Sequence, residues 1–481
     1  MKKTSLTKNY IYNLSYQLLV LVIPLITMPY ISRVLGDYNV GVFNFIQAVV
    51  GYFVLFGCVG LNLYGQREIA ACGDDLVKRS KVFWELQTIR TVTVGVAFLL
   101  YTLCVRLMVK EISLYYYLFS IEILASILDI SWFFQGIEQF RVQTIRNLAV
   151  KATGVACIFL FVKTEQDLAI YIGCYAATVF LGNLWLWFCL RGDLIRMPMH
   201  QLRPLRHIKP VLIVFLPQIA TSIYAQLDKT MIKFLSDFNE VAYYSQAEKI
   251  VKLVLTVVTA MGLVMLSRIA IIHSKKDKEQ VIKYINNSFR YLFFLMWPCM
   301  FGCMAIAHKF VPWYFGAGYE KVAPCMIVLS PIIVMIGLSN TLGTQYLLPT
   351  NQMKFYTTSV IVGAVTNALL NLILIKPLGC IGASIATVLA ELAVTAVQFW
   401  FLRHTFKPTI LLQGWKNFFA AVVMGAAVWL VSLVTEVSIL NTFIEIVVGI
   451  VVYVAVLLLL KDDFFLSMLR RVLRRGERDA V

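Results

Sequence analysis

The sequence predicts an all-α protein that crosses a membrane many times. Of its 481 residues, 60% are hydrophobic and only 14% are charged, whereas soluble domains have about 45–50% apolar and about 25% charged residues. The apolar residues fall into fourteen stretches, each close to the roughly 20 residues that a helix needs to span a bilayer. The connections between them are too short for a folded extramembrane domain. These observations exclude a water-soluble enzyme and a disordered chain.

The first expected span follows three lysines near the N-terminus. Its apolar run is too long for the core of a signal peptide and lacks a small-residue cleavage site, so we expect an uncleaved span. No Cys-x-x-Cys motif or Cys/His pair among the ten cysteines indicates a metal or redox centre. To within a few residues, the fourteen expected spans are 10–31, 39–63, 82–105, 114–135, 147–163, 168–190, 210–236, 240–267, 286–308, 323–344, 356–375, 381–403, 416–435 and 442–460.

The basic residues predict how these spans are oriented. With the N-terminus in the cytoplasm, 30 of the 43 lysines and arginines lie in inner segments and seven lie in outer loops. Because cytoplasmic loops are enriched in Lys and Arg, both termini and the loop 191–209 are expected to be cytoplasmic. The net charge of +17 reflects this asymmetry and favours anionic lipid headgroups. The basic tail is expected to anchor there, and nucleic-acid binding is not expected.

A repeat with an offset of 200 residues relates the two halves of the chain. The stretch 33–39 (RVLGDYN) closes the first span, and 233–239 (KFLSDFN) closes the seventh. The repeat predicts two six-helix bundles in the same orientation, related by a pseudo-twofold axis along the membrane normal. Such parallel repeats are typical of transporters, whose substrate site lies between the halves. The predicted domains are the N-terminal bundle 1–200, the C-terminal bundle 201–405, two additional spans in 406–461 and a cytoplasmic tail in 462–481.

Several stretches between about residues 8 and 400 resemble one family of bacterial transporters. They are 31–36 (ISRVLG), 62–70 (NLYGQREIA), 132–138 (WFFQGIE), 216–218 (LPQ), 227–229 (LDK), 243–250 (YYSQAEKI), 347–350 (LLPT), 371–375 (NLILI) and 382–387 (GASIAT). In these motifs the chain resembles the polysaccharide repeat-unit flippases. That family is related to the multidrug and toxin extruders and to the lipid II flippases, within the multidrug/oligosaccharidyl-lipid/polysaccharide exporter superfamily.

The resemblance implies a function and a set of partners. It implies two bundles around a central cavity that pass undecaprenyl-diphosphate-linked oligosaccharide repeat units to the outer leaflet of the bacterial cytoplasmic membrane by alternating access. The flipped unit would enter the synthesis of a capsule or O-antigen type polysaccharide. The implied partners are the lipid-linked oligosaccharide, membrane lipids, a polysaccharide polymerase and a chain-length regulator. No cofactor is implied.

Charged residues inside the seventh and eighth spans are candidates for the transport site. They are Asp228, Lys229, Lys233, Glu248, Lys249 and Lys252. A charge at mid-bilayer costs about 2.5–3.5 kcal/mol on insertion scales, so these residues are expected to face protein or water. Gln218 shares a helix face with Lys229 and Lys233, which predicts a polar stripe along an aqueous cavity. Two interpretations stay open: neutralised ion pairs, including an ordinary i, i+4 pair of Glu248 with Lys252, or contacts with substrate or a coupling ion. The candidates for a coupling-ion site are Asp228, Glu248 and, in the twelfth span, Glu391.

A diphosphate headgroup also needs positive charge along its route. Burying an unpaired phosphate is prohibitive, and arginine forks fit phosphate oxygens best. The inner mouth offers Arg67, Arg90, Arg146, Lys151, Arg268 and Arg290, and the outer side offers Arg33 and Lys233. Arg90 is the strongest candidate because it lies well inside the third span. The other inner arginines lie near span ends, where a long side chain also reaches lipid headgroups without binding a substrate.

Alternative functions differ in the residues they require. The sequence contains no HExxH, GxSxG or P-loop motif and no GxGxxG between a strand and a helix, so neither a catalytic residue nor a metal site is predicted. A multidrug or toxin cation antiporter favours an acidic cavity, whereas this cavity is predicted to be basic on balance. A lipid II flippase is a second alternative within the superfamily. A membrane-embedded polysaccharide polymerase or ligase typically needs a large outer loop, and every predicted outer loop is short.

Overall fold

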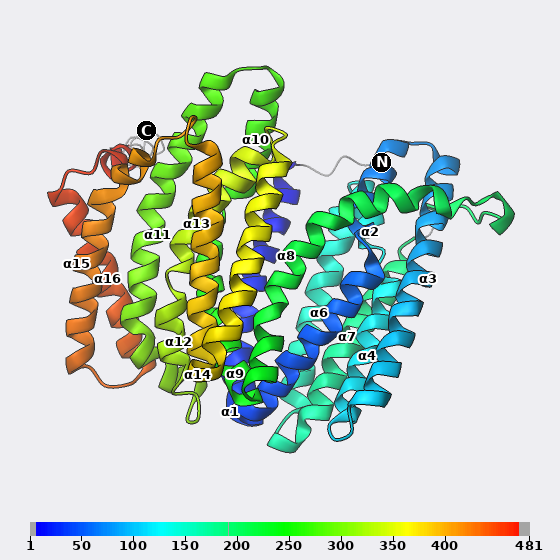
Figure 1. Ribbon diagram of the computed structural model, residues 1–481, viewed down its shortest axis with the longest axis horizontal. Coiled ribbons are helices and arrows are strands. Elements are labelled where there is room, and N and C mark those ends of the chain that lie inside the picture. Colours follow the sequence, from blue (N-terminus) through cyan, green and yellow to red (C-terminus); the bar gives the residue numbers. More distant parts are fainter. Residues whose placement is uncertain (1–5, 191, 471–481) are drawn as a thin grey trace. The chain divides into compact units, whose positions relative to one another are not determined.

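The computed structural model describes residues 6–190 and 192–470, with side chains from residue 23 onward except at a few interior positions. Within these residues, regular structure is helical and no β-strand occurs (Figure 1). Ten of the described helical segments are long and apolar enough to cross a membrane. The predicted all-α, polytopic membrane fold is thereby confirmed, and the exact number of fourteen spans stays a prediction.

The chain divides into two compact units, Met1–Thr230 and Met231–Val481. The first contains α1 (Leu6–Cys58), α2 (Leu61–Cys72), α3 (Leu76–Met108), α4 (Ser113–Leu128), α5 (Ser131–Gly136), α6 (Phe140–Phe161), α7 (Leu168–Phe188) and most of α8 (Ile208–Leu235), with short 3-10 helices η1 (Glu165–Asp167), η2 (Met199–Gln201) and η3 (Pro204–His207). The second contains α9 (Phe238–Thr259), α10 (Gly262–Ser274), α11 (Lys278–Phe315), α12 (Val322–Leu329), α13 (Ile332–Ser339), the π-helix η4 (Asn340–Leu347), α14 (Met353–Leu402), the 3-10 helix η5 (Pro408–Gly414), α15 (Trp415–Val434) and α16 (Ile439–Leu459). The division into bundles and additional spans that the repeat predicts stays a prediction.

Several predicted spans are joined or interrupted in the structure. The first two form one long helix, α1, which bends at Gly36 (φ 74°), and the eleventh and twelfth form α14, which bends at Gly379 (φ 57°). Glycine adopts this left-handed backbone without steric cost. The fourth span consists of α4 and α5, and the tenth of α12, α13 and η4. A break of this kind persists in a membrane only where other groups satisfy the freed backbone atoms.

In the first unit, the bend in α1 contacts the short helix η1. Asn39 Nδ2 donates to the backbone oxygen of Glu165 at 2.9 Å and to that of Leu35 at 3.0 Å. A Cβ atom on Gly36 would lie 3.7 Å from Glu165 Oε1. The connection after the first expected span therefore packs on the connection before the sixth.

In the second unit, the bend in α14 is likewise bonded to a residue of another helix, at the start of α9. The backbone amide of Cys380, directly after Gly379, donates to Glu240 Oε2 at 2.7 Å, and the other carboxylate oxygen pairs with Lys321. The hydrogen bond to Glu240 raises the pKa of the Lys321 ammonium, which lies outside the predicted spans. Glu240 is only 6% exposed, so this carboxylate caps the second segment of α14 from within the unit.

The aromatic core of the first unit joins two of the family-like motifs. Trp132 on α5 is 1% exposed and stacks on Phe83 of α3 with ring centroids 5.5 Å apart. A Cβ on Gly65 of α2 would lie 2.6 Å from the Trp132 ring, and one on Gly136 would lie 2.7 Å from Ile69. The two glycines therefore allow α2 and α5 to approach closely, and the motifs 62–70 and 132–138 are packing partners.

Candidate functional site

The predicted site residues occur in both units. The first unit contains Arg33, Arg67, Arg90, Arg146, Lys151, Gln218, Asp228 and Lys229, and the second contains Lys233, Glu248, Lys249, Arg268, Arg290 and Glu391. A single cavity lined by both sets stays a prediction. Within the first unit, the structure brings two of the arginines, Arg90 and Arg146, to the same helix end.

Arg90 is buried inside the first unit, with 1% of its surface exposed. Its Nη1 donates to the backbone oxygen of Asp129 at 2.6 Å, and its Nη2 donates to Cys58 Sγ at 3.3 Å. Asp129 is the C-terminal cap of α4, and the C-terminus of a helix carries partial negative charge that a cation stabilises. Its Nε is buried and has no hydrogen-bond partner among the described residues. This location explains the buried charge without a bound substrate.

Three further side chains donate to the same helix end. Gln87 Nε2 bonds to the oxygen of Ile127 at 2.8 Å, Trp187 Nε1 to that of Leu128 at 2.9 Å, and Asn183 Nδ2 to that of Ala125 at 2.8 Å. The last carbonyl groups of a helix have no intrahelical partner. Together with Arg90, side chains from α3 and α7 therefore satisfy the end of α4 at its break from α5.

Arg146 on α6 is connected to the same end of α4 through Asn183. Its Nη1 donates to Asn147 Oδ1 at 2.6 Å, and its Nη2 donates to Asn183 Oδ1. A Cβ on Gly182 would overlap Val150, so α6 and α7 pack closely here. Arg146 is half-buried and Lys151 lies one turn further along the same helix, also half-buried. Asn183 thus connects Arg146 to the end of α4 that Arg90 caps.

Two further basic candidates of the first unit lie on its surface. Arg33 is exposed shortly before the bend in α1, and Arg67 is exposed on α2. Exposed arginines near the ends of apolar segments are in the position from which long side chains reach lipid headgroups. Their location fits both a contact with lipid headgroups and a contact with the diphosphate of the substrate.

The acidic candidate of α8 is buried against α1. Asp228 is 5% exposed, and two residues further the hydroxyl of Thr230 lies 3.2 Å from that of Tyr52. Gln226 fits against α1 only because Gly51 has no side chain. Gln218 and Lys229 are half-buried on the same helix, so the polar stripe predicted along α8 is partly enclosed by protein.

In the second unit, the charged candidates at the end of α8 and on α9 lie close to partners on α9. Glu248 is 5% exposed and pairs with Lys252 at 2.5 Å, which is the i, i+4 pair that the sequence analysis considers. The ammonium of Lys233 lies 4.1 Å from the centroid of the Phe238 ring. Lys249 is half-buried. These contacts fit the interpretation of structural pairs, and a role in transport stays a prediction.

Arg268 on α10 and Glu391 on α14 differ in exposure. Arg268 is exposed on α10, with its guanidinium carbon 5.0 Å from the centroid of the Tyr284 ring. Glu391 is 9% exposed in the second segment of α14. A carboxyl this deep in a predicted span is expensive when ionised, so Glu391 remains a candidate for a coupling-ion site.

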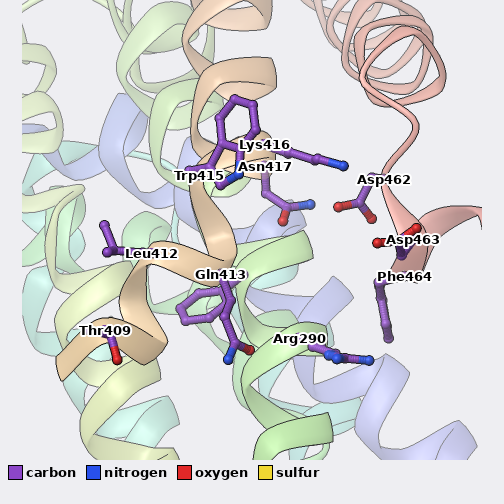
Figure 2. A pocket seen from close by; sticks show the side chains of 11 residues that line it. Arg290, Thr409, Leu412, Gln413, Trp415, Lys416, Asn417, Asp462, Asp463 and Phe464 are labelled. Carbon is purple, nitrogen blue, oxygen red and sulfur yellow. The ribbon is translucent and has the colours of Figure 1, made fainter. Parts of the chain in front are cut away.

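Arg290 lies in a different setting from the other arginines. It lines a pocket of about 390 Å³ between α11, the start of α15 and the chain after α16, together with Lys416, Asp462 and Asp463 (Figure 2). Exposed Trp415 borders the same pocket. Two carboxylates beside the two cations make the pocket unsuited to a diphosphate alone, because like charges in close proximity repel.

A buried acid on α3, Glu85, was not among the predicted site residues. Its side chain is fully buried and accepts hydrogen bonds from Arg203 N at 2.8 Å, Arg206 Nη2 at 2.5 Å and His207 Nε2 at 2.9 Å. His207 Nδ1 in turn lies 2.8 Å from the hydroxyl of Tyr64. Glu85 therefore fixes the segment that leads into α8 onto α2 and α3.

A second acid that the sequence analysis missed, Glu122, lies in the middle of α4. Its Oε1 accepts a hydrogen bond from the hydroxyl of Tyr175 at 3.3 Å, and Gln47 Nε2 donates to the same hydroxyl at 3.0 Å. Its Oε2 is buried without a hydrogen-bond partner among the described residues. A carboxylate well inside the apolar stretch 114–135, seven residues before Asp129, is a signal that could have identified it, because ionisable residues within spans are usually functional.

No group of three or more His, Cys, Asp or Glu side chains in the described part of the chain could hold a metal ion. The chemistry that these residues can perform is binding of anions, exchange of protons and neutralisation of buried charge.

Comparison with protein families gives two matches. The model of the polysaccharide biosynthesis protein family matches residues 6–266, and the model of the lipid II flippase MurJ matches residues 138–449. A protein of Escherichia coli (strain K12) for which O-antigen transport is proposed is 26% identical over 84% of this chain and 98% of its own length.

Two solved structures share the fold. The inward closed conformation of the lipid II flippase MurJ superimposes with a TM-score of 0.74 at 14% identity, over 95% of this chain and 100% of that chain. The inward-facing conformation of a multidrug resistance MATE family transporter superimposes with a TM-score of 0.65 at 13% identity, over 82% of this chain and 97% of that chain. At these identities the similarity shows the fold alone.

Proposed function

Because the chain belongs to the polysaccharide biosynthesis protein family, we propose that it moves lipid-linked oligosaccharides across a membrane. It is a multi-pass membrane protein and a polysaccharide flippase of the multidrug/oligosaccharidyl-lipid/polysaccharide exporter superfamily. The proposed cargo is an undecaprenyl-diphosphate-linked repeat unit for an O-antigen or capsule type polymer. The proposed location is the bacterial cytoplasmic membrane, with both termini in the cytoplasm.

The observation that carries the proposal is the near full-length similarity to the E. coli relative, which covers 98% of that protein. An arginine and a lysine on α6 add a physical argument. Arg146 is half-buried and held by Asn147 and Asn183, and Lys151 follows on the same helix. A lipid diphosphate requires such fixed positive charge, since an unpaired phosphate cannot enter a low-dielectric site.

Transport of lipid II is a second candidate function. It is supported by the match of the lipid II flippase model to residues 138–449. Both cargoes are diphosphate lipids with a saccharide headgroup, so they place the same demand on the basic residues and differ in the saccharide. A polysaccharide polymerase and a chain-length regulator are the proposed partners of the first function only.

The experiment is complementation in two bacterial hosts, one lacking its O-antigen flippase and one depleted of its lipid II flippase. Restored surface polymer in the first host, without rescue of growth in the second, is the expected result. The opposite pattern would assign the lipid II function, and rescue of neither host would contradict both. Arg146→Gln is expected to reduce polymer synthesis at least tenfold at unchanged protein level. The matched control on the same helix is Arg141→Gln, because Arg141 is exposed.

A further inference from the structure

Glu122 has the geometry of a group that is neutral in the observed arrangement. It lies on α4 where this helix packs against α1, α3 and α7. One carboxyl oxygen accepts a hydrogen bond from Tyr175, which is itself bonded to Gln47, and the other is buried without a partner in the described part of the chain. The carboxyl group thus has one neutral donor where an ionised carboxylate would require several.

Aromatic rings pack around Tyr175, the hydrogen-bond partner of Glu122. The rings of Phe43 and Phe119 lie 5.6 Å and 6.0 Å from that of Tyr175, measured between centroids, and Phe43 also packs on Tyr171 at 4.5 Å. The phenol that bonds the carboxyl group is therefore itself held in an aromatic cluster of α1, α4 and α7.

Among the described residues, the titratable groups that interact with Glu122 are two phenols, Tyr175 on α7 and Tyr101 on α3. The hydroxyl of Tyr101 donates to the backbone oxygen of Tyr116 on α4. α1 contributes an amide, Gln47. Among the described residues, no Lys, Arg or His forms an ion pair with Glu122. Burying an unpaired carboxylate costs far more than burying the neutral acid, so the acid form is the one this packing holds.

We propose that Glu122 is a proton-binding site that couples transport to the proton gradient, an inference that rests on the proposed transport function. In the packed arrangement the carboxyl group holds a proton on one oxygen. When α4 separates from α1 and α7 and water enters, the O–H bond breaks, the proton passes to water and the carboxylate is solvated. When the helices close again, the carboxylate must first take a proton from water, because no cation among the described residues pairs with it in the closed site.

A proton fits this site better than a metal cation. The site offers one carboxyl group, one phenol and one amide, and the polar atoms of the phenol and amide are already bonded to each other. Glu122 is also distinct from the coupling candidates that the sequence suggests, since Glu248 is paired with Lys252 and Asp228 lies on α8. Protonation would therefore alter the packing of α4, α1 and α7 within the first unit.

The test uses the full-length protein in liposomes with a lipid-linked oligosaccharide and an imposed pH gradient. Glu122→Gln, which mimics the neutral acid permanently, is expected to lose the part of the flipping rate that depends on the gradient. The control is Glu445→Gln. Glu445 is a fully buried carboxyl group of the second unit, with one hydrogen bond from Thr435 at 3.0 Å, and this variant should keep the wild-type response. A full gradient response in Glu122→Gln, or a response of the wild type to sodium but not to pH, overturns the proposal.

A second measurement separates the proton site from the transport function. Infrared spectra of the protein without substrate should show a protonated carboxyl band that disappears as the pH is raised, and this change should be absent in Glu122→Gln. Tyr175→Phe removes the hydrogen bond and should shift the pH at which the band disappears. If the wild type flips no oligosaccharide and the band behaves as expected, the proposed function fails and the proton site stands. If the Glu122→Gln spectra match those of the wild type, the proton site fails whatever the protein transports.

Discussion

The guanidinium of Arg90 donates a hydrogen bond of 2.6 Å to the backbone oxygen of Asp129, at the end of α4. Replacing Arg90 with Met leaves that oxygen without its donor and removes the cation from the helix end. We expect a loss of about 1–3 kcal/mol of stability, seen as a lower melting temperature and a lower yield of folded protein. Arg90→Lys should retain part of the stability, because a lysine ammonium can still reach a helix C-terminus.

An Arg90→Met variant that is stable but inactive would instead indicate that Arg90 binds the substrate. If Arg90→Met accumulates to the wild-type level with an unchanged melting temperature but synthesises no polymer, the guanidinium contacts the cargo in another state of the transport cycle. Thermal unfolding in detergent and polymer synthesis in cells, measured on the same variant, separate the two roles.

Glu85 is expected to determine how firmly the segment 193–207 is attached. Glu85→Ala removes the acceptor of three hydrogen bonds, one of them to a charged Arg206, so the segment should be released and cleaved faster by proteases. The measurement is limited proteolysis of the purified protein, followed by identification of the cut sites. Asp74→Asn, an exposed acid near the start of α3, is the control and should leave the cleavage rate unchanged.

The close packing of α2 and α5 predicts opposite effects for two glycine substitutions. Gly65→Ala places a methyl group 2.6 Å from the Trp132 ring and should destabilise the protein by about 1–3 kcal/mol through overpacking. Gly95→Ala, in α3, meets nothing within 4 Å and should be neutral or stabilise by about 0.5–1 kcal/mol. Thermal unfolding compares them directly. Equal effects of both would mean that α2 and α5 are not tightly packed.

Removal of Glu240 should destabilise the protein more than removal of Lys321. Glu240→Ala leaves the buried amide of Cys380 unbonded and should cost about 1–3 kcal/mol. Lys321→Ala removes an ion-pair partner whose side chain is 59% exposed, and such pairs contribute about 0–1 kcal/mol. Melting temperatures should therefore fall much more for the first variant. A larger fall for Lys321→Ala would show that the ion pair, and not the backbone cap, stabilises the bend.

The predicted orientation can be checked by cysteine labelling in a background without the ten natural cysteines. His200→Cys and Ala317→Cys place single thiols at exposed positions. With both termini in the cytoplasm, an impermeant reagent added to intact cells should label residue 317 and not residue 200. The reverse pattern would contradict the orientation inferred from the basic loops.

The sequence was sufficient for the fold class because apolar stretches of membrane length are a strong and local signal. It also located the turns at residues 36–39 and 236–239, where the repeat lies. It did not reveal that α4 ends at Leu128, since the break before Ser131 is not marked by proline or glycine. That helix end gives Arg90 a structural partner that the sequence does not show, and a role of Arg90 in anion binding stays a prediction.

The two missed acids have a similar explanation. A diphosphate needs positive charge, so the basic residues are the first candidates for its site, and the acidic candidates lie beside lysines or in later spans. Glu85 and Glu122 form hydrogen bonds with residues far away in the sequence, Glu85 with His207 and Glu122 with Tyr175. A single sequence carries no information about those pairings.

The four hydrogen bonds at the end of α4 have a mechanical consequence. A discontinuous membrane helix is commonly regarded as a hinge. Here four side chains from α3 and α7 hold the end of α4, and α5 itself packs closely on α2. The break therefore behaves as a rigid joint that transmits force between α4 and α5.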